Sequence, residues 1–354
     1  MAYTEILTTY DVTAEQWDTQ IMEEYLGQVF WRFNMGPSDD ACIQTKMDLT
    51  KKPGDAITIN LRSKLQGGHV TGRNRGIGNE GKIDAYGQRI TIDNDRQVIK
   101  FYDITMSQQR VSWSLLQSGR SALVDAAKFQ LEDDITTAMA DTAAGRVRGR
   151  YLYGAVDSNW NATHATALTN VDNTADQLTT GMIDIGKRKA VLTVNATAKI
   201  RPMKVMVGQA YQEWFTFVGH TYCVRDMILN DAAWRNAQLN IPPGSNGDSV
   251  IYTGSSFKGS WNGVLVYEWD RVPLVSSTIQ VGHNLLMGAQ AGAVCWGQMS
   301  KFGEEFNDIG HEVSYELHEI RGIKKVVYGR NAIDSSISDE DNGVVHCFAA
   351  AVAD

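Results

Sequence analysis

The segment GRNRGIGNEGKIDAY, residues 72–86, decides between two very different folds. Its glycines Gly76, Gly78 and Gly81 have the G-x-G-x-x-G spacing that is associated with dinucleotide binding. That fingerprint binds a pyrophosphate only where a buried strand leads into the first glycine and a helix begins at the third. Here further glycines interrupt the upstream side, and the downstream residues RITID, 89–93, alternate at period two as a strand does. The setting of a nucleotide-binding enzyme is therefore missing on both sides.

The outer flanks of this segment predict a long hairpin instead. AITINLR, residues 56–62, alternates apolar and polar side chains after a Pro-Gly turn signal, and residues 89–93 do the same. The connection between these strands is too long for a tight turn, so we expect an extended loop that projects from the body. Its basic residues Arg62, Lys64, Arg73, Arg75, Lys82 and Arg89 outnumber its acidic residues Glu80 and Asp84. Two interpretations stay open, a solvated surface loop and an arm that binds a partner.

Composition limits the class of protein. The chain has 354 residues, of which 43% are hydrophobic and 21% charged, with a formal net charge of -8. This length suits about two domains with a substantial core, and the acidic balance argues against specific DNA recognition. The first residues lack a basic start followed by an apolar run, and no apolar stretch is long enough to span a membrane. We expect a cytosolic, soluble protein with no membrane contact.

Residues that would carry catalysis or bind a metal are scattered. The histidines His311 and His318 are seven apart in a strand pattern, not four apart on a helix as in zinc proteases. Neither a nucleophile elbow nor a P-loop is present. The cysteines are isolated, without the close spacing of zinc or redox sites: Cys42, Cys223, Cys295 and Cys347. We therefore expect no enzyme, no catalytic residues, no cofactor and no metal site.

Two long helices are predicted. Trp17, Tyr25 and Phe30 recur at helical spacing, so residues 14–33 predict an amphipathic N-terminal helix that packs on its own core or on a neighbouring subunit. Residues 107–144 predict a longer helix, interrupted or kinked at Gly119. The basic run that follows, Arg146, Arg148 and Arg150, suits the negative end of this helix and is a candidate for proximity to DNA.

The remaining chain predicts mixed helices and strands, and hence an α+β fold. Residues 151–176 are interpreted as a loop. Helices are expected at 178–190, 210–217 and 230–238, and strands at 203–207, 250–253, 264–269, 285–287, 311–320, 324–328 and 344–351.

This order of elements resembles that of the major capsid proteins of tailed bacteriophages. The segments that carry the closest resemblance, to the podovirus-like branch of that family, are MKVMV at 203–207 with residues 209–217, NDAAWRNAQ at 230–238, GVLVYEWDRVP at 263–273 and LMGAQA at 286–291. The resemblance covers nearly the whole chain, although these segments mark packing and turns and not catalysis.

The resemblance implies a tailed-phage major capsid fold with five parts. These are an N-terminal arm (1–50), an extended hairpin loop with flanking strands (51–106), a peripheral domain with a spine helix (107–200), an inserted axial domain (201–305) and returning peripheral-domain strands (306–354).

The implied function is that of a structural major capsid protein, which self-assembles as hexamers and pentamers into an icosahedral shell around double-stranded DNA. Its place is the virion, after assembly in the cytoplasm of the host bacterium. The hairpin would reach across a neighbouring subunit, where basic side chains meet acidic ones. The predicted inter-subunit contacts are Trp17, Tyr25, Phe30, Arg62, Lys64, Arg73, Arg75, Glu80, Lys82 and Asp84.

The expected partners are further copies of the chain, a portal protein, and a scaffolding protein that is separate because the arm helix begins close to Met1. A decoration protein is a further candidate, and contact with packaged DNA would be non-specific. We expect no covalent crosslink through Lys64 or Lys82. Two alternatives stay open: a nucleotide-binding enzyme that uses Gly76 to Gly81, and a tail or decoration protein, against which the long helix argues.

Overall fold

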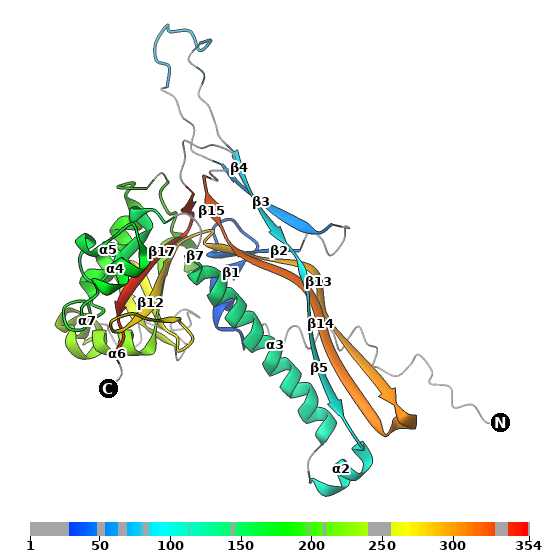
Figure 1. Ribbon diagram of the computed structural model, residues 1–354. Coiled ribbons are helices and arrows are strands. Elements are labelled where there is room, and N and C mark those ends of the chain that lie inside the picture. The colour runs from blue at the N-terminus through cyan, green and yellow to red at the C-terminus, as the bar shows by residue number, and fades with distance from the viewer. Residues whose placement is uncertain are drawn as a thin grey trace.

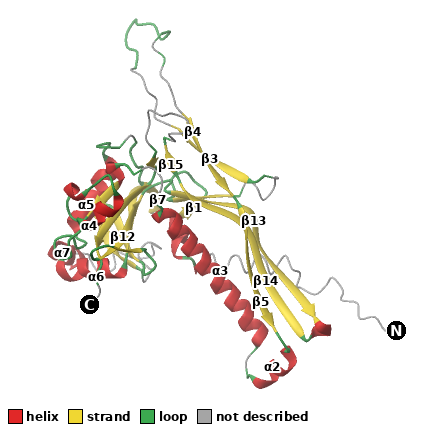
Figure 2. Cartoon of the chain, in the orientation of Figure 1, coloured by secondary structure: helices red, strands yellow, loops and turns green. Residues whose placement is uncertain are grey.

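The computed structural model describes residues 28–47, 54–62, 69–78, 80, 85–112, 114–142, 146–196, 198–207, 210–239, 256–329 and 339–352. The molecule has three parts (Figure 1): a rounded unit of helices around one sheet, a narrow sheet that runs beside a long helix, and a thin hairpin that projects beyond both. Figure 2 shows that helices gather on the rounded unit, whereas strands dominate the rest.

The narrow part is called the long sheet here. Within the described residues its strands follow the order β1 (Met35–Gly36), β2 (Ile43–Lys46), β13 (Gly292–Asn307), β14 (Glu312–Lys325) and β5 (Asp93–Phe101). Along β14, Val313, Tyr315 and Leu317 are buried, while Glu316 and His318 are only partly covered. Because successive side chains point to opposite faces, the sheet has an apolar face and a polar face. This confirms the alternation predicted for residues 311–320.

The apolar face of the long sheet is covered by one helix. α3 (Leu115–Ala140) has 26 residues and is therefore about 39 Å long at ~1.5 Å per residue. A shorter helix, α2 (Ile104–Arg110), precedes it, so the helix predicted for residues 107–144 is divided. The break lies before Ser114, which caps the N-terminus of α3, and not at Gly119. Gly119 is instead a contact point, because a Cβ there would collide with the ring of Phe101 on β5.

The rounded unit is built on the wide sheet. Its described strands follow the order β6 (Tyr151–Tyr153), β17 (Val344–Ala350), β12 (Gln280–Met287), β8 (Ala210–Gly219), β10 (Val264–Glu268) and β9 (Phe257–Trp261), with β11 (Leu274–Ser276) paired to β12 and β7 (Met203–Val207) paired to β8. The helices of this unit are α4 (His164–Thr169), α5 (Thr180–Val191), α6 (Thr221–Asn230) and α7 (Ala232–Leu239). Every residue of β17 is buried: α5 and α6 cover one face of the sheet, and the end of the long sheet, together with α4 and the residues around it, covers the other.

Short elements complete the described chain. The hairpin consists of β3 (Ala56–Arg62) and β4 (Ala85–Thr91), and a small ribbon of β15 (Val327–Tyr328) and β16 (Glu340–Asp341). Single 3-10 turns are η1 (Phe30–Asn34), η3 (Arg148–Arg150), η4 (Asp157–Asn159) and η6 (Asp308–Gly310).

Several sequence predictions were wrong. Residues 210–217 form strand β8, not a helix, because their backbone pairs with β7, β10 and β12. The predicted loop at 151–176 contains β6 and α4. Of the strand predicted at 324–328, residues 324 and 325 are the end of β14, and only residues 327–328 form a separate strand, β15. β13 was not predicted at all. The predicted strand at 250–253 and most of the predicted helix at 14–33 lie outside the described residues.

The predicted division into five parts is not the division of the sheets. The returning segment 306–354 contributes β14 to the long sheet and β17 to the wide sheet. β6, from the predicted peripheral part, pairs in parallel with β17. The boundaries of functional domains stay a prediction.

Candidate assembly surfaces

The base of the hairpin is anchored to the long sheet by apolar side chains. Ile57, Ile59, Leu61 and Ile90 are all at most 5% exposed. They pack with Ala293, Cys295 and Val326 in one buried cluster. Because this cluster joins β3 and β4 to β13 and the end of β14, the hairpin leaves the body at a fixed place.

Two glycines let the hairpin base approach the sheet closely. A Cβ on Gly322 of β14 would collide with the carbonyl oxygen of Thr91, and a Cβ on Gly297 of β13 would lie 2.5 Å from Cδ1 of Ile92. At Gly322 the obstacle is backbone, so only a residue without a side chain fits there, whereas at Gly297 the tip of the Ile92 side chain would have to move.

The tip of the hairpin is exposed throughout its described length. Residues 69–78 and 80 are all exposed, and Ile77 has 87% of its surface accessible. A Cβ added at Gly72, Gly76 or Gly78 would meet nothing within 4 Å. Exposed apolar and charged side chains on a projecting loop are typical of a surface that contacts another molecule.

The glycine spacing does not form a phosphate site in this structure. Of the described residues, those that follow the loop form strand β4, and none of the described helices begins at Gly76 or Gly78. The backbone N–H of Gly78 donates instead to both carboxylate oxygens of Glu80, at 2.9 Å each. These hydrogen bonds lower the pKa of Glu80. The carboxylate of Glu80 thus takes the place that a bound phosphate would have at Gly78, and its hydrogen bonds stabilise the turn.

The residues predicted for inter-subunit contact have different positions. Arg73, Arg75 and Glu80 lie in the exposed tip, and the backbone of Arg62 ends strand β3. The other hairpin and arm residues, Lys64, Lys82, Asp84, Trp17 and Tyr25, lie outside the described residues. The structure therefore brings three of the predicted residues together at the tip, and their contact with a neighbour stays a prediction.

Phe30 has a place inside its own chain. Its backbone N–H donates to the buried carboxylate of Glu132 on α3 at 2.8 Å, and its ring stacks on Trp269 with centroids 4.1 Å apart. The neighbouring Trp31 is fully buried and donates from Nε1 to Thr136 at 3.3 Å. Burial, opposed by the bond from Phe30, raises the pKa of Glu132. Phe30 anchors the end of the arm to its own subunit, and its predicted contact with a second copy stays a prediction.

The basic run at 146–150 does not cap α3. The helix ends at Ala140, and the ammonium of Lys325 donates to the carbonyl of Asp141 at its C-terminus. Arg146 donates to the hydroxyl of Tyr153 at 2.6 Å, and Arg148 pairs with Asp157 at 3.0 Å. Arg150 has no exposed surface and therefore cannot touch DNA.

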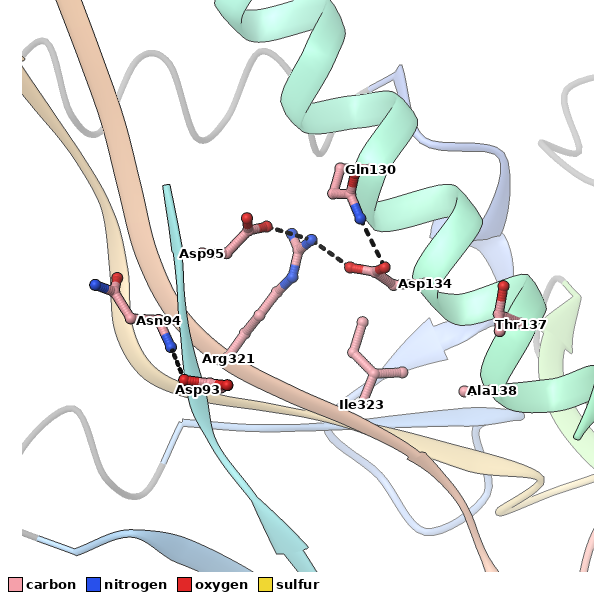
Figure 3. Close-up of a pocket in the computed structure, with 9 residues that line it drawn as sticks. All are labelled: Asp93, Asn94, Asp95, Gln130, Asp134, Thr137, Ala138, Arg321 and Ile323. Carbon is pink, nitrogen blue, oxygen red and sulfur yellow. Dashed lines mark hydrogen bonds and ion pairs between the residues drawn. The ribbon is translucent and has the colours of Figure 1, made fainter. Parts of the chain in front are cut away.

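A polar pocket of about 470 Å³ lies between α3 and the long sheet. Figure 3 shows the Arg321 guanidinium between Asp95 of β5 and Asp134 of α3, at 2.7 and 2.6 Å, and Arg321 also pairs with Glu319. Burial opposes this charge, but the three carboxylates outweigh it and raise the pKa of Arg321. These ion pairs join α3 to the long sheet, and they engage the guanidinium of Arg321 in structural contacts.

A second exposed surface was missed by sequence reasoning. At the far end of the long sheet Tyr102, Met106, Phe306 and Ile309 are 50% to 103% exposed. Ile309 has a φ of 57°, which is strained for a β-branched residue. The sequence signal was the Asn-Asp-Ile-Gly turn before residue 311, which would have revealed that β13 precedes β14 as a hairpin.

Other kinds of site are limited by what the structure describes. In the described part of the chain, no group of three or more His, Cys, Asp or Glu side chains could hold a metal ion. The cysteines Cys42, Cys223, Cys295 and Cys347 are buried free thiols. None of the described helices is long and apolar enough to cross a membrane.

A family model described as phage capsid protein matches residues 8–353. The chain belongs to the phage capsid protein family. It is a structural major capsid protein and is part of the virion. The family and fold are those of a structural, non-enzymatic protein.

Solved capsids have the same fold. The capsid of cyanophage Pam1 is 20% identical, with 100% of this chain and 97% of that chain covered and a TM-score of 0.74. The capsid of Ralstonia phage GP4 is also 20% identical, with 92% of each chain covered and a TM-score of 0.73. The acid-stable capsid of Helicobacter pylori bacteriophage KHP30 is 12% identical, with 89% and 88% covered and a TM-score of 0.67. These likenesses confirm the predicted tailed-phage major capsid fold. None of the curated proteins compared with the chain matches it.

Proposed function

We propose that this capsid protein builds an icosahedral shell of hexamers and pentamers around double-stranded DNA, and that the hairpin tip holds neighbouring copies together. The observation that carries the proposal is the contrast within one hairpin. Its base is at most 5% exposed at Ile57, Ile59, Leu61 and Ile90, whereas every described tip residue is exposed. A chain that fixes one end of a hairpin and exposes the other presents a preorganised arm, which lowers the entropic cost of binding.

The charge of the tip favours an acidic partner surface. His69, Arg73 and Arg75 lie in the described tip, where Glu80 is already engaged by Gly78. The whole chain carries a net charge of -8, so a second copy offers more acidic than basic side chains. Charge complementarity of this kind sets orientation and rate of association, while each exposed pair adds little affinity. Shell strength must therefore come from many repeated contacts.

The proposed setting includes other proteins. Assembly would take place in the cytoplasm of the host bacterium, with a separate scaffolding protein, a portal protein and, as a further candidate, a decoration protein. Arg146 and Arg148 are engaged by Tyr153 and Asp157 within their own chain, so contact with packaged DNA would be non-specific and weak.

Electron microscopy with mass analysis tests the proposal. The intact chain should form capsomers or closed shells, and replacement of residues 69–80 by a Gly-Ser linker should abolish them while circular dichroism and thermal unfolding stay unchanged. The matched control replaces the exposed residues 173–175, in a loop of the rounded unit, by a Gly-Ser stretch of equal length and should leave assembly unchanged. Shells from the linker variant, with the same size and yield as from the intact chain, would overturn the role of the hairpin.

A further inference from the structure

A row of buried polar groups crosses from the long sheet to the wide sheet. The ammonium of Lys325, at the end of β14, lies 2.7 Å from Oδ1 of Asp341. Oδ2 of Asp341 lies 2.9 Å from Nε2 of His346 on β17, and Nδ1 of His346 lies 2.7 Å from Nε2 of His283 on β12. All four side chains are at most 3% exposed. The row therefore links strands of both sheets through the ribbon strand β16.

The hydrogen-bond directions along this row follow from the carboxylate. An ionised carboxylate only accepts, so Nε2 of His346 carries the hydrogen and donates to Asp341. Nδ1 of His346 is then an acceptor, and Nε2 of His283 donates to it. Both imidazoles are neutral in this arrangement, and each contact has one donor and one acceptor.

The charges around the row are balanced as long as both histidines are neutral. Lys325 neutralises Asp341, and the fully buried Arg150 lies 3.5 Å from the carboxylate of Glu340 and donates to the carbonyl of Asp341 at 2.9 Å. The charged and titratable groups that face the histidines or Asp341 from the packed elements are Lys325 on β14, Glu340 and Asp341 on β16, Arg150 in η3, Tyr151 and Tyr153 on β6, His164 on α4, Arg146, and Asp141 after α3.

A proton added to this row has no favourable place. On Nδ1 of His346 it would force His283 to move its own hydrogen from Nε2 to Nδ1, and it would place a second buried positive charge near the ammonium of Lys325. On the other nitrogen of His283 it would create an imidazolium beside the ring of Phe348, which stacks on His283 with centroids 4.4 Å apart. A buried charge without a partner is strongly unfavourable.

We propose that the row Lys325, Asp341, His346 and His283 is an acid-sensitive latch between the two sheets. Above neutral pH it is neutral overall and holds the ribbon β15–β16 against both sheets. In mild acid the histidines take up protons only when the row opens, so acid opens the junction while the two sheets themselves remain folded. The two sheets are thus held in a fixed relative position at neutral pH and can move relative to each other in mild acid.

The direction of the pH effect can be stated for each histidine. Burial lowers the pKa of both His346 and His283 below that of an exposed histidine, about 6.5. The open state therefore binds more protons, and the stabilisation is complete above about pH 6.5 and lost as pH falls below it. The opening constant should rise by at most about tenfold per pH unit for each histidine, and a histidine that stays neutral in the closed row down to pH 5 contributes about 30-fold.

Hydrogen exchange of the full chain, read by mass spectrometry at pH 7.5 and pH 5, tests the latch. Protection factors, which correct for the intrinsic effect of pH on exchange, should fall at least about 30-fold at residues 326–328 and 339–342, in and beside the ribbon β15–β16. Protection at residues 215–218, in the centre of the wide sheet, should stay unchanged. Equal protection of the junction at both pH values would overturn the proposal, and this measurement on the unmodified chain needs no variant.

Glutamine variants separate the latch from general acid sensitivity. His346→Gln keeps one donor for Asp341 and one acceptor for His283 but cannot titrate, so it should reduce the acid response to that of a single histidine. His346→Gln combined with His283→Gln should abolish it. The matched control is His311→Gln, an exposed histidine at the far end of the long sheet, which should respond as the unmodified chain does. An undiminished acid response in a folded His346→Gln chain would contradict the latch.

Discussion

The two sheets of this capsid protein bury their side chains in opposite ways. In the wide sheet, β17 is buried at every position and β12 at all but its first. In the long sheet, β14 alternates between buried and partly covered positions, and β5 alternates between partly covered and exposed ones. The wide sheet has covered faces on both sides, whereas the long sheet has one face covered by α3 and another that is charged and open.

This difference shows how one chain separates stability from assembly. The central strands of the wide sheet are buried within the single chain. The long sheet, with the hairpin at one end and Tyr102, Met106, Phe306 and Ile309 at the other, presents exposed surface along most of its length. Changes in the wide sheet should therefore alter folding, and changes at the ends of the long sheet should alter assembly.

The largest effect is expected for Phe217→Ala in the wide sheet. Phe217 is fully buried on β8, between Val266 and Leu286 on the neighbouring strands. Its truncation should lower the free energy of unfolding by about 3–5 kcal/mol, because a cavity remains in a core closed on both sides. Val98→Ala, at a 57% exposed position of β5, is the matched control and should change the free energy of unfolding by less than about 0.5 kcal/mol. Urea titration followed by circular dichroism measures both, and equal losses would remove the contrast between the sheets.

A smaller loss is expected for Arg321→Met on the covered face of the long sheet. Without the guanidinium, Glu319, whose side chain is 4% exposed, keeps a buried charge without its ion pair. Removal of one partner of such a buried pair lowers the free energy of unfolding by about 3 kcal/mol. The loss should be somewhat smaller here, because Asp95 and Asp134 are partly exposed and water can solvate their charges. Arg96→Met removes a comparable guanidinium from the open face, where Arg96 pairs with Glu316 at 2.7 Å, and should leave the melting temperature unchanged. A larger effect at position 96 than at 321 would contradict the assignment of the two faces.

Gly322→Ala should have an effect of about 1–3 kcal/mol, since the new methyl group collides with the carbonyl of Thr91 and lifts the hairpin base. Gly303→Ala is the matched control in the same sheet, because its Cβ would lie 3.7 Å from that of Glu316, an ordinary contact. Thermal unfolding of the two variants compares them directly. If Gly322→Ala is as stable as Gly303→Ala, the close approach of hairpin and sheet is not what fixes the arm.

The smallest effect on folding is expected for Ile77→Ser at the hairpin tip. Ile77 is 87% exposed, so its loss should leave the free energy of unfolding unchanged within about 0.5 kcal/mol. Shell yield, measured by sedimentation and electron microscopy, should nevertheless fall, because the tip is proposed to contact a second copy. Thr71→Ser, a conservative change in the same exposed loop, should affect neither quantity. Normal shell yield for Ile77→Ser would remove this side chain from the contact.

Predictions from the sequence held where the pattern was local. Residues 56–62 alternate strictly and form β3, and residues 178–190 largely form α5. The prediction failed at 210–217, where aromatic residues at helical spacing belong to a central strand whose partners are distant in the sequence. β13 was missed because its glycines break the strand pattern, although Gly292 and Gly297 are there for close packing. For the candidate contact residues, the sequence located the exposed tip but not the anchoring of Phe30.

The sequence by itself determined the local elements and the hairpin, because side-chain periodicity and turn residues act over a few positions. Only the tertiary structure decided that β17 completes the wide sheet while β14 belongs to the long sheet, since strand order depends on contacts between residues far apart in the chain. It also decided the fate of charged residues such as Arg150 and Lys325. Whether a charged side chain is buried and paired depends on residues that are distant in the sequence and pack around it, so it cannot be inferred from the local sequence.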